Sequence, residues 1–107
     1  MTEEAEKRAT GFLGICMRAG QLLSGQEACV DAVRREAARI VLLDEAASPN
    51  TVKRLRDACR THGVPLYALS AGTLGRRIGR EGRVVVALNE GGMAEKLLEL
   101  VKDEPRL

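Results

Sequence analysis

Apolar residues recur along the chain in two alternating patterns, one helical and one extended. Between Glu4 and Ala19 they follow the three- and four-residue spacing of an amphipathic helix, which predicts a first helix that ends at Gly20. The short run 22–24 predicts an extended piece, and Gly25 then opens a second helix that ends near Glu36. We expect the inner face of this second helix to carry Ala28, Cys29, Ala32 and Val33.

Unbroken aliphatic runs predict strands. The runs 40–43 and 84–88 have the composition of strands that are buried on both faces, so helices must cover both sides of the sheet. A further strand is predicted over 66–69. Ser48 and Pro49 mark the start of a helix between the strands 40–43 and 66–69. Serine can accept from the free backbone N–H groups of a helix start, and proline has no N–H to satisfy there.

Helices fill the remaining intervals. The helix that begins at Pro49 has an apolar stripe of Val52, Leu55, Ala58 and Cys59. Ser70 is expected to cap a short helix through Ile78, and a last helix runs from Met93 or Ala94 to Lys102. The alternation predicts a three-layer α/β/α sandwich around a small mixed sheet of about four strands, in one domain spanning 1–107.

Composition agrees with a single small globule. The 107 residues are 45% hydrophobic and 30% charged, enough to bury a core and to cover it with solvated groups. No apolar run approaches the roughly 18 residues of a membrane-spanning helix. The start of the chain is acidic and lacks the features of a secretory signal, so we expect a cytoplasmic protein.

Charge is unevenly distributed, although the formal net charge is only +2. Residues 51–89 hold eight bases and two acids, a local net charge of +6, which favours binding of a polyanion such as nucleic acid. Seven of these eight bases are arginines, whose forked guanidinium suits phosphate. A solvated basic helix and a glycine-rich connection would explain the same pattern, and the role of Lys53, Arg54, Arg56 and Arg60 stays open.

Motifs for catalysis or cofactor binding are weak. No glycine-rich segment matches a nucleotide-binding fingerprint, and the three cysteines have no C-x-x-C pair, so we expect buried thiols. The one histidine, His62, precedes Gly63 and Pro65 and is interpreted as a helix-end residue. Asp44 and Glu45 could serve an enzyme at a strand end, yet a solvated strand end explains them equally well. We expect no metal and no organic cofactor.

Several spaced motifs, taken together, resemble one family. They are Leu22–Gly25, Ala37–Thr51, Gly63–Pro65, and Leu74–Gly79 followed by Val84–Ala87. In this order they are similar to the L-seven-Ae/L-thirty-e ribosomal protein superfamily, and within it to the small bacterial YlxQ-like branch. The resemblance extends from about Leu13 to Val101. It implies a four-stranded sandwich that binds kink-turn RNA, a sharply bent duplex with tandem sheared G·A pairs, without enzymatic activity.

The resemblance also implies where RNA binds. In the family the second helix begins with a pattern like Gly-Thr-Asn-Glu-x-x-Lys and enters the RNA groove at the sheared pairs. Gly25 matches this pattern, whereas Gln26, Glu27, Ala28 and Asp31 replace the threonine, asparagine, glutamate and lysine.

Asp31 puts an anion where the family has a cation, unless Arg34 or Arg35 neutralises it. Arg35 matches a basic residue that holds backbone phosphate, and 80–83 corresponds to the loop that contacts a protruding nucleotide. The candidate RNA-binding residues are therefore Arg18, Gly25, Gln26, Glu27, Asp31, Arg34, Arg35, Arg80, Glu81, Gly82 and Arg83.

These observations favour a monomeric, ribosome- or translation-associated protein that recognises kink-turn-like structured RNA, either ribosomal or in a messenger leader. Two alternatives stay open. One is a protein-interaction module whose basic helix meets an acidic partner on a ribosome or transcription complex, with only nonspecific affinity for RNA. The other is a small enzyme that uses Asp44 and Glu45.

Overall fold

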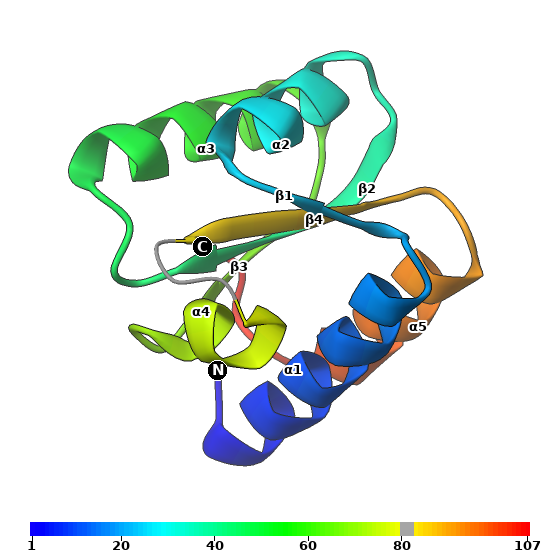
Figure 1. Cartoon of the computed structure of the whole chain (residues 1–107). Helices are drawn as coiled ribbons and strands as arrows, with labels where there is room; N and C mark the ends of the chain where they lie inside the picture. The colour runs from blue at the N-terminus through cyan, green and yellow to red at the C-terminus, as the bar shows by residue number, and fades with distance from the viewer. Residues whose placement is uncertain (80–82) are drawn as a thin grey trace.

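The computed structural model describes residues 1–79 and 83–107 and contains helices and strands in regular alternation (Figure 1). In chain order these are α1 (Glu3–Arg18), β1 (Leu22–Ser24), α2 (Gln26–Arg34), β2 (Ala38–Asp44), α3 (Pro49–His62), β3 (Leu66–Leu69), α4 (Thr73–Ile78), β4 (Val85–Asn89) and α5 (Gly92–Val101).

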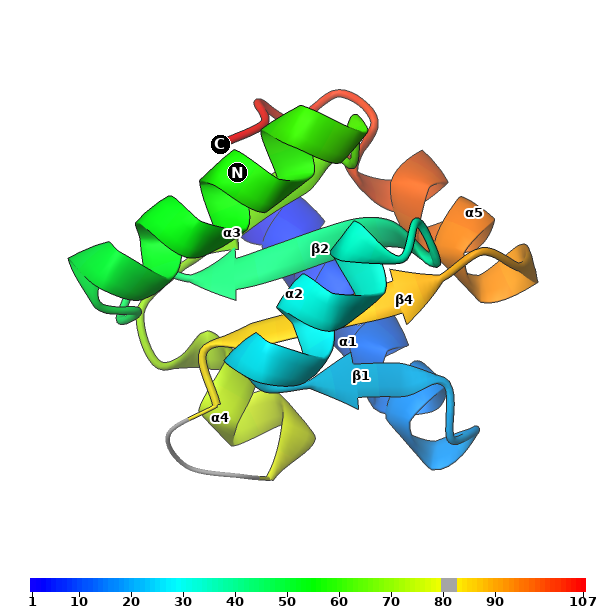
Figure 2. The same cartoon turned by 90° about the horizontal axis from the view of Figure 1, so that it is seen from above.

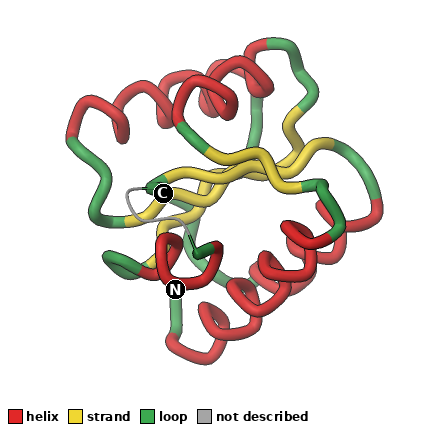
Figure 3. Tube along the Cα trace, viewed as in Figure 1, coloured by secondary structure: helices red, strands yellow, loops and turns green. Residues whose placement is uncertain are grey.

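The four strands form one mixed sheet in the order β1-β4-β2-β3. Strand β4 is antiparallel to both of its neighbours, and β2 is parallel to β3. Helices α2 and α3 cover one face of the sheet, and α1, α4 and α5 cover the other (Figures 1 and 3). The predicted three-layer α/β/α sandwich with a small mixed sheet is confirmed.

The central strand β2 separates two hydrophobic clusters. Ile40 and Leu42 point into the cluster shared with α1, α4 and α5, whereas Val41 and Leu43 point into the cluster under α2 and α3. Side chains alternate across a strand, so a strand covered on both faces has to be apolar at every position. The prediction that this run is buried on both sides is confirmed.

The thiols are buried, as expected. Cys16 lies in the cluster under α1, and Cys29 and Cys59 lie in the cluster between α2, α3 and the sheet. All three thiols are free.

Local sequence correctly predicts both ends of α3. Ser48 Oγ accepts from the backbone N–H of Thr51 at 3.2 Å, and Pro49 occupies the first helical position. The helix ends at His62, and Gly63 follows in the left-handed conformation with φ 68°. The interpretation of His62 as a helix-end residue is confirmed.

Two expectations about the helices are wrong. Ser70 does not cap α4: Gly72 is the cap residue, with φ 83°, and Ser70 instead donates from its backbone N and its Oγ to Glu6, at 3.0 and 2.9 Å. In α2, Ala28 is exposed and Val30 is buried instead. The buried stripe is centred near Cys29 and Val33, and Ala28 is turned away from it because it lies about 100° before Cys29 around the helix.

Within residues 1–79 and 83–107, the structure contains no helix with the length and apolar character needed to cross a membrane.

Candidate nucleic-acid interface

The candidate residues centre on the N-terminus of α2, which β1 places at one end of the sheet. Gly25 joins the two elements with φ 101° and ψ 151°, and its backbone N donates to the Val85 carbonyl oxygen at 3.0 Å. Figure 2 shows the first turn of α2 directly after the end of β1, with α2 then crossing the sheet. The start of α2 is thereby anchored to β4.

The backbone donors at this helix end have no side-chain cap among the residues that the structure describes. Gly25 has no side chain that could cap the helix, and Cys29 N reaches the Gly25 carbonyl oxygen at 3.1 Å as the first bond of the helical ladder. The N–H groups of the preceding residues therefore point outward, where the helix dipole adds positive potential. Such a helix end suits an oxygen acceptor or an anion.

Arg83 lies against Gly25. A Cβ atom built on Gly25 would meet Arg83 Nη1 at 2.7 Å, so the guanidinium fills the space that any larger residue would need. The structure thus brings together two predicted residues that are far apart in the sequence. The other members of the same predicted loop, Arg80, Glu81 and Gly82, lie outside the described residues.

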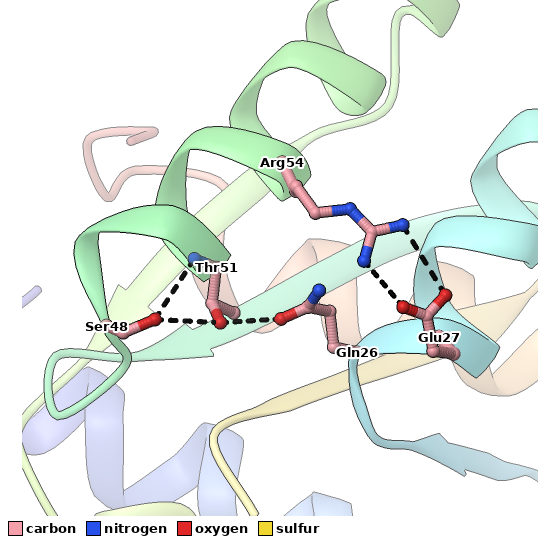
Figure 4. A network of polar contacts seen from close by, with 5 residues as sticks. All are labelled: Gln26, Glu27, Ser48, Thr51 and Arg54. Carbon is pink, nitrogen blue, oxygen red and sulfur yellow. Dashed lines mark hydrogen bonds and ion pairs between the residues drawn. The ribbon is translucent and has the colours of Figure 1, made fainter.

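A chain of hydrogen bonds fixes the side chain of Gln26 (Figure 4). Ser48 Oγ donates to Thr51 Oγ1 at 3.1 Å, and Thr51 Oγ1 donates to Gln26 Oε1 at 2.5 Å. Because the amide oxygen of Gln26 already accepts this bond, the amide nitrogen carries the donors that remain for a ligand.

Glu27 forms a two-pronged ion pair with Arg54 of α3 (Figure 4). Arg54 Nη1 lies 2.6 Å from Glu27 Oε1, and Nη2 lies 3.4 Å from Oε2. The hydrogen bond and the charge of Arg54, with a smaller contribution from Arg34, hold the pKa of Glu27 below its ordinary value. The acidic residue at this helix end is therefore ionised and has a cationic partner.

The other candidates lie farther from the start of α2. Asp31 pairs with Arg35, with Asp31 Oδ2 and Arg35 Nε 2.9 Å apart, so the expected neutralisation of Asp31 comes from Arg35. Arg34 is exposed in the last turn of α2. Arg18 ends α1 and precedes β1, whereas Gly25 follows β1.

A cavity of about 330 Å³ adjoins Arg83. It is lined by Asp44, Ala46, Gly72, Gly75, Arg76, Arg83 and Val84. Its lining includes two arginines, Arg76 and Arg83, and one acid, Asp44.

Asp44, considered above as a catalytic residue, has a structural role. It is 1% exposed, and its carboxylate accepts from the backbone N–H groups of Ala46, Gly72 and Leu74 at 2.8, 3.0 and 3.1 Å. These bonds hold the turn after β2 and the start of α4, so a solvated strand end is the wrong description for Asp44. Of these two acidic residues, Glu45 is the exposed one.

Sequence reasoning missed two contributors, Thr51 and Arg54. Arg54 lies off the apolar stripe of α3, which indicated a side chain facing water or a partner. Its pairing with Glu27 depends on how α2 packs against α3, and no local sequence signal encodes that packing. No group of His, Cys, Asp or Glu suited to a metal ion occurs among the residues that the structure describes.

Comparison with known proteins gives a consistent result. The sequence profile of the ribosomal protein L7Ae/L30e/S12e/Gadd45 family matches residues 8–98. RNA-binding protein YlxQ of Bacillus subtilis (strain 168) is 42% identical over 91 residues, which cover 84% of this chain and 91% of that protein. RNA-binding protein YlxQ of Enterococcus faecium is 34% identical over 103 residues, which cover 95% and 99% of the two chains.

Two solved structures have similar folds. A protein of unknown function from Bacillus halodurans C superposes with a TM-score of 0.79 at 35% identity, covering 88% of this chain and 96% of that one. The Giardia lamblia 15.5kD RNA binding protein superposes with a TM-score of 0.81 at 20% identity, covering 96% and 89%.

Proposed function

Because the chain belongs to the ribosomal protein L7Ae/L30e/S12e/Gadd45 family, we propose that it is a non-enzymatic RNA-binding protein that recognises kink-turn-like structured RNA. Both YlxQ relatives and the Giardia lamblia protein are named as RNA-binding proteins. Association with the ribosome or with translation is part of the same proposal.

The observation that carries this proposal is the cluster of donors at the start of α2. Free backbone N–H groups, the amide nitrogen of Gln26 and the guanidinium of Arg83 all belong to this end of the helix. RNA offers acceptors of two kinds at close range, phosphate oxygens and base edges, and a bent duplex exposes both. A cluster of donors that includes one arginine matches that target.

Two further features support a kink-turn in particular. The Gln26 amide is fixed by Thr51, which suits a single hydrogen-bonding arrangement at a base edge rather than nonspecific contact. The cavity beside Arg83 has two arginines in its lining, and we propose that it receives the protruding nucleotide.

The test is a titration of the protein against a kink-turn RNA and a matched duplex that lacks the sheared G·A pairs, at two salt concentrations. We expect preference for the kink-turn, with binding that weakens by about 0.7 to 0.9 log units per log unit of salt for each phosphate contact. Equal, salt-sensitive binding to both RNAs would reject the kink-turn and leave only electrostatic attraction.

The Arg83→Ala variant locates the site, and Arg106→Ala is its control, because Arg106 is an exposed arginine near the end of the chain and lines a different cavity. We expect Arg83→Ala to lose about tenfold in affinity and Arg106→Ala to bind like the wild type. Equal losses in both variants would mean that the interface lies elsewhere.

A second candidate function rests on the outer face of α3. A groove of about 500 Å³ there combines apolar and basic side chains, as a surface for an acidic protein partner would. It is lined by Ala47, Pro49, Val52, Lys53, Arg56, Asp57 and Arg60. A protein partner that stays bound after nuclease treatment, together with no RNA selectivity in the titration, would favour this function over the first.

A further inference from the structure

Arg54 belongs to α3, yet its guanidinium lies at the N-terminus of α2, where it is bonded to Glu27 (Figure 4). We propose that Arg54 is an RNA-contact residue, held in position by Glu27, which supplies the cation for a phosphate beside the start of α2. This inference rests on the proposed function and adds a residue of α3 to the interface.

The hydrogen-bonding capacity of the guanidinium supports this role. Arginine has five N–H donors, and the pair with Glu27 uses one on Nη1 and one on Nη2. The Nε–H and the second hydrogen on each terminal nitrogen are not used by Glu27. Arg54 can therefore keep its carboxylate partner and still donate to a phosphate oxygen.

The exposure of the two partners indicates which of them is fixed. The Arg54 side chain is 30% exposed, whereas the Glu27 side chain is 80% exposed. The Arg54 side chain is the less exposed of the two, and its fork is oriented by two bonds to one carboxylate. A preorganised arginine loses less conformational entropy when it binds phosphate than a free surface side chain does.

Charge balance on α2 gives the second argument. The exposed side of this helix carries two acids, Glu27 and Asp31, and both would repel phosphate if unpaired. Arg35 pairs with Asp31 near the end of the helix, and Arg54 pairs with Glu27 near its start. Of these two cations, only Arg54 lies at the helix end where the other donors gather.

Lys53 offers a matched comparison on the same helix. It is adjacent in sequence and also paired, with Lys53 Nζ and Asp57 Oδ2 2.8 Å apart, but its side chain is 75% exposed. Lys53 lines the outer groove of α3 rather than the start of α2. Removing either base changes the net charge equally, so a difference in binding between the two variants cannot come from net charge alone.

The experiment measures affinity for a kink-turn RNA, at several salt concentrations, of the full chain carrying Arg54→Met, Lys53→Met or Glu27→Gln. We expect Arg54→Met to weaken binding about tenfold and to reduce the salt slope by about 0.7 to 0.9, the value for one lost phosphate contact. Lys53→Met should keep both quantities near the wild type.

Glu27→Gln distinguishes a direct contact between Arg54 and RNA from a role of Arg54 in positioning Glu27. It breaks the ion pair and leaves the cation, so we expect the salt slope to be retained or to steepen. If Arg54 merely held Glu27 in place, Glu27→Gln would reproduce both losses of Arg54→Met, and the inference would be overturned. An unchanged salt slope in Arg54→Met would also overturn it.

Arg54→Lys covers the case in which Arg54→Met does not fold, because it keeps the charge and loses the fork. It should retain the salt slope with lower affinity, and wild-type affinity would contradict the need for a fork. Wild-type protein that shows no preference for the kink-turn rejects the proposed function itself, whereas a selective wild type with an unaffected Arg54→Met rejects this inference alone.

Discussion

At the scale of single residues, Gly25 combines two demands that only glycine meets. Its φ of 101° is strained for any residue with a side chain, and the place of a Cβ is taken by Arg83 Nη1. The backbone conformation sets how α2 starts, and the missing Cβ lets the guanidinium lie against the helix end. One position therefore controls both the stability and the chemistry of the interface.

Replacing Gly25 with alanine should lower the free energy of unfolding by about 1 to 3 kcal/mol, because the positive φ is retained at a cost. The new Cβ should also push Arg83 away and weaken RNA binding. Thermal unfolding and an RNA titration measure the two effects.

Gly11→Ala is the control, since Gly11 lies within α1 and a Cβ there would meet nothing within 4 Å. We expect it to raise stability by roughly 0.5 to 1 kcal/mol, the gain of alanine over glycine in a helix. If the Gly25→Ala variant binds RNA with unchanged affinity, the contact between Arg83 and Gly25 is not important for binding.

Asp44 provides the second prediction at this scale. In Asp44→Asn an amide nitrogen replaces one carboxylate oxygen and cannot accept, so at least one buried backbone N–H loses its partner. We expect the free energy of unfolding to fall by about 1 to 3 kcal/mol in a urea titration. The exposed neighbour Glu45→Gln should stay within about 0.5 kcal/mol of the wild type, and equal effects in the two variants would contradict the structural role of Asp44.

The contrast between Ser48 and Asp44 shows what local sequence encodes at the residue scale. Ser48 acts three residues away, and its role follows from its position before Pro49. Asp44 accepts hydrogen bonds from Gly72 and Leu74, which lie 28 and 30 positions later in the sequence. Glu27 pairs with Arg54, which lies 27 positions later. Such partners are set by the packing of elements, which the alternation of helices and strands does not specify.

At the scale of elements, α1 and the start of α4 are joined through Glu6. Its carboxylate accepts from Ser70 N, Ser70 Oγ and Thr73 Oγ1, at 3.0, 2.9 and 3.1 Å. Burial opposes ionisation, but the bonds from Ser70 and Thr73 outweigh it, and the pKa of Glu6 lies below its ordinary value of 4.5. The short helix α4 thereby gains an anchor that its own sequence lacks.

This depressed pKa has a definite sign in the pH dependence of stability. The ionised carboxylate stabilises the folded state fully above the unfolded pKa, and that contribution is lost as the pH falls through the folded pKa. Glu6→Gln should therefore melt below the wild type at pH 7, and the difference should shrink at pH values below 4.5. Melting curves across this range test it, with the exposed Glu4→Gln as control; a difference that stays constant with pH would contradict the role of the charge.

The interface of α2 and α3 with the sheet predicts unreactive thiols. Burial raises the pKa of Cys29 to about 12, with a further contribution from nearby Cys59, and burial raises the pKa of Cys59 to about 11. Both thiols stay protonated at pH 8 and are covered by the core. We expect a thiol reagent to label them only after denaturation, and rapid labelling of the native protein would mean that α2 and α3 separate readily.

The length of an element decides how well its sequence predicts it. The 14-residue helix α3 has a cap, a proline and a terminal glycine, and both of its ends are predicted correctly. The six-residue α4 is too short to show a clear apolar stripe. Its start, after the cap residue Gly72, depends on hydrogen bonds to Asp44 and Glu6 from other elements. Tertiary contacts replace local signals where a helix is short.

At the scale of the whole molecule, the bases of the segment 51–89 that the structure describes lie on more than one surface. Arg54 pairs with Glu27 and Arg83 lies against Gly25, both at the start of α2, whereas Lys53, Arg56 and Arg60 line the outer groove of α3. The charge count predicted a polyanion partner but could not divide the arginines between these surfaces. The layered fold was predictable from the alternation, but the strand order was not, because it depends on pairing between distant segments.

The pairing of β1 with β4 decides when, during synthesis, the proposed RNA-binding site is complete. Leu22 pairs with Leu88 and Ser24 with Val86, and Gly25 N is bonded to Val85 O. A chain emerging from the ribosome at about 5 to 20 residues per second contains α2 and α3 well before β4. During that interval Arg83 is absent and the Gly25 N–H has no partner on β4, although Thr51 and Arg54 of α3 are already present to position Gln26 and Glu27. The proposed RNA-binding surface is therefore completed only when β4 has been added, late in synthesis.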